Sequence, residues 1–360
     1  MARVRNSIRD AALRTLKSGG LFELVKNSRW RQQRLLIICY HGVALEDEHL
    51  WRPYLFVSPR QLEQRFEILR NGSYAVLRLG DAVEKLYKGE LPPGSIALTF
   101  DDGTYDFYRQ SYPQLKHYGF PATVYLTTYY SGRRYPVFGL ICSYMLWKRR
   151  DLRTVYLGEV GISERFDLDT EQVRRHIVSE LVAGSDRRDL SGKERDGVAA
   201  KLAGVLKIDY GELCAKRILQ VMAEPEVNEL SRAGVDFQLH THRHRTPSDE
   251  GLFRREIREN REKIENYAAN RGVHFCYPSG DYRAEFLPWL SAEGVVSATT
   301  CDTGLASPGS NPLLLPRLVD TTGRSELVFE SWVSGVGQFL SFRKRAGSGP
   351  DPRKDGHNPR

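Results

Sequence analysis

Apolar runs and amphipathic segments alternate along most of the chain. Continuous apolar runs suit strands that are buried on both faces, and they occupy residues 35–40, 95–100, 122–127, 236–239, 274–278, 295–300 and 313–319. Between them, apolar residues recur at the spacing of a helix face in segments 60–71, 80–88, 106–118, 251–271, 283–293 and 325–340. Strands that alternate with helices predict a mainly parallel sheet covered on both faces, and therefore an α/β fold.

A charge-rich stretch interrupts this alternation at about residues 138–225. Its sequence includes EQVRRHIVSELVAG and KERDGVAAKLAGVLKI, which have helical patterning. We interpret the stretch as a helical subdomain inserted into a single α/β domain that spans residues 31–342.

Both ends of the chain are basic. Residues 1–30 hold seven Lys or Arg against two Asp or Glu. Apolar residues recur among them at helical spacing, namely Val4, Ile8, Ala12 and Leu16. This pattern predicts a basic amphipathic helix that contacts an anionic membrane surface weakly and peripherally. Residues 343–360, with six Lys or Arg against two Asp, are rich in Gly and Pro and are expected to be disordered.

The distribution of charge argues against a nucleic-acid enzyme. The chain has a net charge of +8, but its two ends supply more than that total, which leaves residues 31–342 near −1. An enzyme that acts on nucleic acid is expected to be basic around its working cleft. We therefore expect no nucleic-acid partner, and no feature of the sequence indicates an obligate protein partner.

Cysteine usage and hydropathy predict a cytoplasmic protein. The five cysteines are odd in number, widely spread and form no CxxC pair, as expected of reduced thiols. The sequence has no apolar run of about 18 residues and no apolar signal-peptide core near its N-terminus. The expected location is the cytoplasm, with peripheral attachment at the inner face of the cytoplasmic membrane.

Two carboxylates follow the strand at 95–100. Asp101 and Asp102 come directly after it, and Gly103 permits a tight turn. Adjacent carboxylates repel each other unless a cation or a shared proton relieves them, although Asp-Gly pairs are also common turn formers. Active sites of parallel barrels collect at the carboxyl ends of strands, which favours a functional role for this pair.

Histidines follow the strand at 236–239. His240 and His244 are four residues apart, so that a helical turn would bring both to one face, while His242 would point elsewhere. Their spacing is that of metal ligands, and a solvated loop is the alternative interpretation.

Two more strand ends carry residues of interest. His41 comes directly after the first strand, and the turn Tyr277-Pro278-Ser279-Gly280 ends the strand at 274–278. Taken singly, a packed histidine and an ordinary turn would explain them. Together with the aspartates and the histidine pair, they favour one shared site over four unrelated structural roles.

Two motifs in this order resemble those of the NodB-type polysaccharide deacetylases, carbohydrate esterase family 4. They are TFDDG at residues 99–103 and an H-[ST]-x-x-H element formed by His240, Thr241 and His244. The resemblance covers most of residues 35–320. It implies a distorted (β/α) barrel, a divalent metal, and hydrolysis of the N-acetyl group of an amino sugar.

The resemblance also implies roles for individual residues. Asp102, His240 and His244 would be the metal ligands and Asp101 the general base. Zinc is the favoured metal, with cobalt, nickel or manganese as alternatives. Two imidazoles and one carboxylate are also a ligand set that leaves open positions for water and substrate, as catalytic zinc requires. By the family pattern, a backbone N–H at Ser279 would meet the oxyanion.

The chain departs from the common family pattern in two places. FCYPSG has no arginine before Pro278, and Ser279 stands where tyrosine is usual. The late histidine motif that supplies the general acid is missing, and the corresponding region reads LLLPRLVD. Both departures resemble the subgroup that deacetylates poly-N-acetylglucosamine, in which an early Tyr-His element supplies the acid, here Tyr40-His41.

The same resemblance places Tyr277, Pro278 and Ser279 around the oxyanion and substrate. Arg317 lies within LLLPRLVD. Its guanidinium could interact with Asp101, with the substrate or with a surface carboxylate.

The sequence thus predicts a metal-dependent hydrolase that removes N-acetyl groups from an amino-sugar polysaccharide or a lipid-linked glycan precursor and releases acetate. One alternative is an amide hydrolase of the same fold with another small N-acyl substrate. A second is an inactive carbohydrate-binding protein, although such a protein has no need of the base Asp101.

Overall fold

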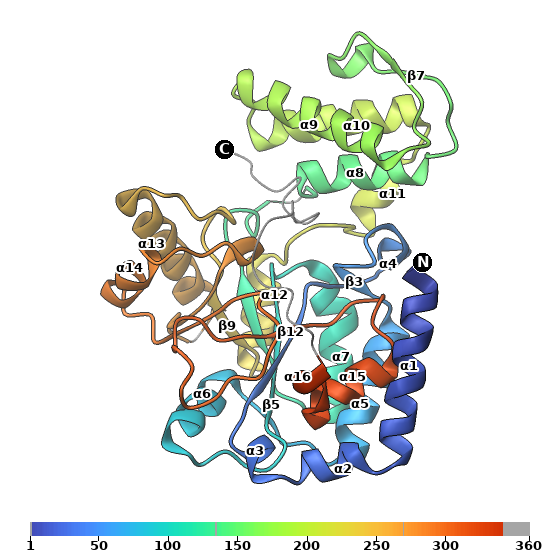
Figure 1. The fold of residues 1–360 in the computed structure, drawn as a ribbon. Helices are drawn as coiled ribbons and strands as arrows, with labels where there is room; N and C mark the ends of the chain where they lie inside the picture. The colour runs from blue at the N-terminus through green and yellow to red at the C-terminus, as the bar shows by residue number, and fades with distance from the viewer. Residues whose placement is uncertain (1, 134, 269, 341–360) are drawn as a thin grey trace. The chain divides into compact units, whose positions relative to one another are not determined.

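The protein consists of two compact units (Figure 1). The structure is a computed structural model that describes residues 2–133, 135–268 and 270–340, with side chains from residue 9 onward. The first unit is formed by residues 2–103, 107–129 and 224–340, and the second by residues 104–106 and 130–223. The predicted disordered tail, residues 343–360, lies outside the described residues.

The first unit is built on eight parallel strands. Their order is β11-β10-β9-β6-β5-β1-β12, with β4 beside the start of β5. The strands are β1 (Leu36–Tyr40), β4 (Val76–Leu77), β5 (Ile96–Phe100), β6 (Thr123–Leu126), β9 (Asp236–Leu239), β10 (His274–Cys276), β11 (Ser297–Thr299) and β12 (Leu318–Val319). A parallel bridge between Thr299 and Leu315 joins β11 to the segment that leads into β12. The two edges of the sheet therefore meet, and the strands form a distorted barrel.

The strands lie where the sequence has its apolar runs. β1, β5 and β6 are buried at every position, as expected of parallel strands covered on both faces. The register of β1 and β5 pairs Tyr40 with Phe100. The carboxyl ends of the two strands are therefore level, and His41 and Asp101 leave the sheet side by side.

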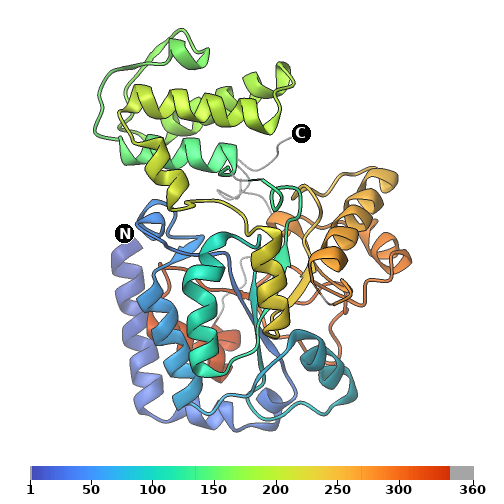
Figure 2. The same ribbon diagram turned by 180° about the vertical axis from the view of Figure 1, so that it is seen from behind.

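Helices cover both sides of these strands (Figures 1 and 2). On one side lie α1 (Ala2–Ser18), α5 (Pro59–Asn71), α7 (Tyr112–Tyr118) and α15 (Glu326–Ser334), and on the opposite side lie α13 (Glu250–Tyr267) and α14 (Phe286–Ala292). The other helices of this unit are α2 (Leu21–Lys26), α3 (Arg29–Gln32), α4 (Glu48–Trp51), α6 (Leu79–Lys88), α12 (Glu224–Arg232) and α16 (Val336–Leu340). α5 is typical: the Ser58 hydroxyl accepts the Gln61 N–H, Pro59 begins the helix, and Leu62 faces the core.

The N-terminal helix α1 belongs to the first unit. Leu13 is buried, and Lys17 Nζ lies 2.5 Å from Glu330 Oε1 on α15. In the expected apolar face, Ala12 is exposed and Leu16 is half-buried. The side chains of Val4 and Ile8, the rest of that face, lie outside the described residues.

The second unit is mainly helical. Its helices are α8 (Phe138–Lys148), α9 (Glu171–Arg187), α10 (Gly192–Leu206) and α11 (Tyr210–Ala215). α8 packs against α9 and α10, and each of the three helices has buried apolar residues, such as Ile141, Leu181 and Leu202. The unit also contains an antiparallel pair that the sequence did not predict, β7 (Val155–Tyr156) and β8 (Arg165–Phe166).

Candidate active site

The turn after β5 separates the two aspartates. Asp102 and Gly103 both adopt left-handed conformations, with φ of 68° and 71°, and the Gly103 N–H donates to Asp101 O at 2.8 Å. A Cβ at Gly103 would lie 2.3 Å from Leu126 Cδ1, so only glycine fits there. The turn leaves the Asp101 side chain 2% exposed and the Asp102 side chain 33% exposed.

Asp102 meets both predicted histidine ligands. His240 Nε2 and His244 Nε2 each lie 3.2 Å from Asp102 Oδ1, and the ligand atoms of the three residues lie within 4.8 Å of one another. Asp102 Oδ1 is buried and has no hydrogen-bond partner of suitable geometry among the described residues. An unsatisfied carboxylate oxygen that faces two imidazoles fits a cation between them.

The tautomer of His240 strengthens this fit. Its Nδ1 lies 2.9 Å from the carbonyl oxygen of Cys276, which can only accept a hydrogen bond, so Nδ1 carries the proton. In the neutral imidazole, the form that binds a metal, Nε2 then presents its lone pair toward Asp102. A histidine ligand whose other ring nitrogen donates to a backbone carbonyl is the usual arrangement at metal sites.

The prediction that a helical turn aligns the two histidines is wrong. Residues 240–245 form an irregular loop, with left-handed backbone at Thr241 (φ 59°) and His244 (φ 54°). Together with Asp102 and Ser279, these make four of the five left-handed non-glycine residues described in the first unit. Such conformations cost about 1–3 kcal/mol each, and their concentration here marks a strained site.

Asp101 is held by Arg317. Nη1 donates to Oδ1 at 2.8 Å and Nη2 to Oδ2 at 2.9 Å, and both side chains are buried. Of the three partners open to Arg317, it therefore pairs with Asp101. Burial on its own would raise the pKa of the Asp101 carboxyl, but the Arg317 guanidinium and then the His41 imidazole hold that pKa well below its usual range.

His41 lies on the other side of Asp101. Its Nε2 is 3.7 Å from Asp101 Oδ2, and its side chain is 19% exposed. Burial lowers the pKa of the His41 imidazole, and the Asp101 carboxylate opposes that effect. His41, Asp101 and the Asp102–His240–His244 set therefore form one contiguous site at the carboxyl ends of β1, β5 and β9.

Three cysteines surround the Asp101–Arg317 pair, an arrangement that was not predicted from the sequence. Cys39 Sγ and Cys276 Sγ lie 3.4 and 3.5 Å from Asp101 Oδ2, and Cys301 Sγ lies 3.8 Å from Arg317 Nη2. A signal was available, because Cys39 precedes His41 by two residues and side chains two apart on a strand share a face. Burial raises the pKa values of the Cys39 and Cys301 thiols.

Two other residue groups have metal-compatible spacing, Cys39–His41–Asp101 and Asp101–His240–Cys276. In both, the carboxylate is already neutralised by its two hydrogen bonds from Arg317. The set built on Asp102 is therefore the one whose carboxylate still requires a cation.

The turn after β10 lies beside Cys301, one of the three cysteines that surround the Asp101–Arg317 pair. Ser279 is exposed and left-handed (φ 57°), and a Cβ at Gly280 would lie 2.8 Å from Cys301 Cβ. Pro278 is buried at the start of the turn. The Tyr277 side chain is also buried, and its hydroxyl donates to Leu313 O at 3.1 Å. Tyr277 thus supports the turn from its buried side, whereas Ser279 is exposed.

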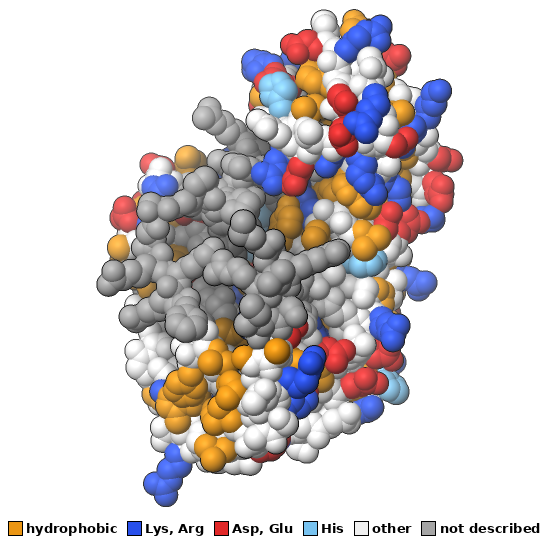
Figure 3. Space-filling model, turned by 45° about the vertical axis from the view of Figure 1, so that its right-hand side comes forward, with side chains coloured by type: hydrophobic (Ala, Val, Ile, Leu, Met, Phe, Trp, Pro, Cys, Tyr) orange, Lys and Arg blue, Asp and Glu red, His pale blue; other side chains and the backbone are white. Residues whose placement is uncertain are grey.

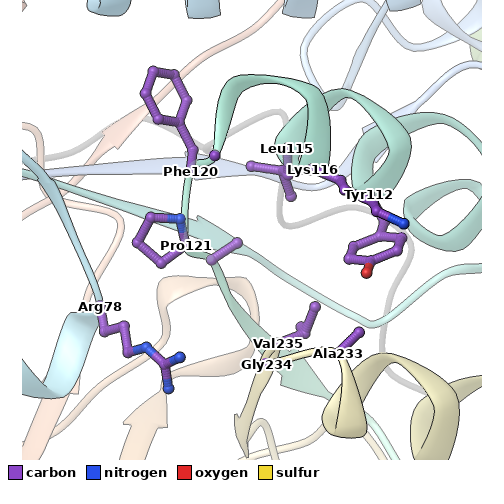
Figure 4. A pocket seen from close by; sticks show the side chains of 11 residues that line it. Arg78, Tyr112, Leu115, Lys116, Phe120, Pro121, Ala233, Gly234 and Val235 are labelled. Atoms are coloured by element: carbon purple, nitrogen blue, oxygen red, sulfur yellow. The ribbon is translucent and has the colours of Figure 1, made fainter.

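A pocket of about 260 Å³ lies elsewhere (Figure 4). It is lined by Ala122 and Val235, which precede β6 and β9, and by Arg78 and Lys116. It therefore lies at the amino ends of the strands, away from the Asp–His cluster.

Comparison with known proteins indicates the class of this domain. A family model described as polysaccharide deacetylase matches residues 88–158 and 205–297, and the unmatched residues between them lie in the second unit. The poly-beta-1,6-N-acetyl-D-glucosamine N-deacetylase of Escherichia coli (strain K12) is 30% identical over 100 residues, which are 28% of this chain and 15% of that protein. The chain thus aligns with less than a fifth of this relative's length.

Two solved structures share the fold. The Streptococcus pyogenes deacetylase PplD, solved in complex with acetate, gives a TM-score of 0.54 at 18% identity and covers 81% of this chain and 94% of that one. IcaB from Ammonifex degensii gives a TM-score of 0.54 at 16% identity and covers 84% of this chain and 97% of that one.

The distorted (β/α) barrel matches the fold of these deacetylases, as the sequence predicted. The chain contains a polysaccharide deacetylase domain, which the family model matches over residues 88–158 and 205–297.

Proposed function

We propose that this protein is a metal-dependent hydrolase that removes N-acetyl groups from an amino-sugar polysaccharide or a lipid-linked glycan precursor and releases acetate. The observation that carries the proposal is the convergence of the ligand atoms of Asp102, His240 and His244 within 4.8 Å, beside the buried Asp101 carboxylate. A divalent cation held there, with zinc favoured over cobalt, nickel and manganese, would polarise the acetamide carbonyl and lower the pKa of a bound water.

Asp101 is proposed to accept the proton of the attacking water. Arg317 holds both carboxylate oxygens, and Oδ2 is the one that also faces His41. Arg317 fixes the carboxylate in one orientation and keeps it ionised, so that it can act as a base. The oxyanion formed by attack would be met by the backbone N–H of Ser279, which lies on the turn after β10.

His41 is proposed to return a proton to the sugar nitrogen. An amide nitrogen leaves as an amine only when it is protonated, and a histidine at the edge of the site is suited to donate that proton. His41 is exposed enough to meet a substrate and near enough to Asp101 to be charge-stabilised by it.

The substrate is proposed to be an N-acetylated glycan. The support is the E. coli relative, whose name specifies a poly-N-acetylglucosamine, together with the polysaccharide deacetylase domain of this chain. Acetate release from N-acetylated glycans of several lengths, with and without added metal, tests the proposal. Release from small N-acyl amides but not from glycans would favour the other amide hydrolase, and glycan binding without acetate release would favour the inactive binding protein.

Loss of either histidine ligand should empty the metal site. His240→Ala and His244→Ala each remove one of three ligands, so zinc content measured on the purified, folded variants should fall to near zero. His117→Ala, an exposed histidine on α7, is the matched control and should retain zinc. Full zinc occupancy in both ligand variants would contradict the assignment of the site.

We also propose a cytoplasmic location with weak contact to the inner face of the membrane. All five cysteines are free, as expected of a reducing compartment. In the described part of the chain, no helix has the length and apolar character needed to span a bilayer. Figure 3 shows hydrophobic side chains gathered on one face of the molecule with Lys and Arg beside them. Within the basic N-terminal segment, Leu24 on α2 is 69% exposed.

This contact should depend on charge and on Leu24. The protein is expected to sediment with vesicles that contain phosphatidylglycerol at low salt and to be released near 1 M salt, where the Debye length is about 3 Å. Leu24→Glu should weaken sedimentation, whereas Leu252→Glu, which changes a 47% exposed leucine on α13, should not. Equal sedimentation of all three proteins would remove this proposal.

A further inference from the structure

Two buried polar residues of α13 contact the loop that carries the histidine ligands. Glu256 and Asn260 are one helical turn apart and are 1% and 0% exposed. They share the buried face of α13 with the apolar residues Phe253, Ile257 and Ile264. A carboxylate and an amide on such a face require hydrogen-bond partners, and they find them in residues 240–245 and at the end of β6.

Asn260 ties the first ligand to the barrel. Its Oδ1 accepts the backbone N–H of His240 at 2.9 Å. Its Nδ2 donates to Leu126 O at 2.9 Å, at the end of β6, and to Thr128 Oγ1 at 2.9 Å. Thr128 Oγ1 in turn lies 2.9 Å from His242 Nδ1. One side chain therefore fixes the start of the loop relative to β6.

Glu256 holds the middle of the same loop. Its Oε2 accepts the Arg243 backbone N–H at 2.7 Å, and its Oε1 accepts from Arg243 Nη1 at 3.0 Å and from Arg245 Nε at 2.9 Å. Its backbone carbonyl also accepts the His242 N–H at 3.2 Å. The two arginines neutralise the buried carboxylate, and the carboxylate fixes residues on both sides of His244.

We propose that Glu256 and Asn260 are positioning residues for the metal site. The loop has no helical or strand hydrogen bonds of its own over residues 240–245, and it contains two left-handed residues. Its backbone amides at His240, His242 and Arg243 are satisfied by α13 instead. α13 thereby sets the conformation that directs both Nε2 atoms at Asp102. This inference rests on the proposed function of Asp102, His240 and His244 as metal ligands.

Zinc affinity of the full-length protein tests the proposal, measured by competition with a chromogenic chelator. Asn260→Leu and Glu256→Gln should each weaken zinc binding about 10- to 100-fold, the usual effect of losing a residue that orients a metal ligand. Glu293→Gln is the matched control. Glu293, at the end of α14, accepts hydrogen bonds from Arg254 and Arg258 of α13 and makes none with the loop. This variant should bind zinc as the unaltered protein does.

The thermal stability of the metal-free proteins separates positioning from a merely structural role. If Asn260→Leu and Glu256→Gln lower that stability but bind zinc with unaltered affinity, the positioning role is overturned. If Glu256→Gln does not fold, Arg245→Met removes one contact of Glu256 from the loop side and should also weaken zinc binding. Failure of the unaltered protein to bind zinc, cobalt, nickel or manganese would instead contradict the proposed function. Measurements on the unaltered protein alone reveal that outcome.

Discussion

Asp101→Asn is expected to abolish deacetylation while zinc remains bound, whereas Asp102→Asn is expected to lose the zinc itself. Asp101 is paired with Arg317 and Asp102 faces the two imidazoles, so the two adjacent carboxylates have separate tasks. An amide cannot accept a proton at neutral pH, and loss of general-base catalysis costs about 10²- to 10⁴-fold in turnover. Zinc content and acetate release, measured on the same preparations, check both expectations.

The Asp102 substitution is conservative for the backbone. Asp102 has φ of 68°, and asparagine tolerates the left-handed region as aspartate does. The turn should therefore survive, and the change in zinc affinity should report the lost negative charge. Equal loss of zinc from both variants would show that the division of labour between the aspartates is wrong.

Stability must be controlled for Asp101→Asn, because it leaves Arg317 buried with a neutral partner. Removing one member of a buried ion pair lowers the free energy of unfolding by about 3–5 kcal/mol. The loss in Asp101→Asn should not exceed this range, because the amide oxygen still accepts a hydrogen bond. Asp320 offers a matched control: its Oδ2 accepts from Arg65 Nε at 2.9 Å, and both side chains are buried. Asp320→Asn should lower stability comparably but retain turnover.

The sequence predicted the strands that are apolar throughout and the residues that follow them. Burial on both faces requires a continuous apolar run, which is visible without a structure, and β1, β5 and β6 were found in this way. Short strands were less predictable. β4 has two residues, and β12 occupies only Leu318–Val319 of the run predicted at 313–319, because strands of this length are fixed by their neighbours in the barrel.

The positions of the site residues depend on contacts that are distant in sequence. The spacing of His240 and His244 indicated a shared role, but it suggested a helix, whereas the loop is shaped by Glu256 and Asn260 on α13. Likewise, no local pattern could decide whether Arg317 pairs with Asp101, which lies 216 residues earlier in the chain. Residue types at strand ends thus predicted the chemistry of the site, and the side chains that orient it required the fold.

His41→Ala should retain zinc and fold yet lose turnover about 10²- to 10⁴-fold, the range that a general acid typically contributes. His41 Nε2 lies 3.7 Å from Asp101 Oδ2, and no zinc ligand of the proposed set is removed by the change. The imidazole has an alternative role as a packed side chain beside β1, in which case its loss would lower stability with little effect on turnover.

Two measurements separate these roles of His41. The first compares kcat for an N-acetylated glycan with kcat for an activated acetyl ester, whose leaving group needs no proton. His41→Ala should lose far more activity on the amide than on the ester. The amine is a poor leaving group that must be protonated by the general acid, whereas the leaving group of the activated ester needs no proton. His117→Ala, on the exposed face of α7, should change neither rate. Near-full kcat on the amide in His41→Ala would place the acid elsewhere, and an equal loss on both substrates would show that His41 positions Asp101 and does not donate a proton.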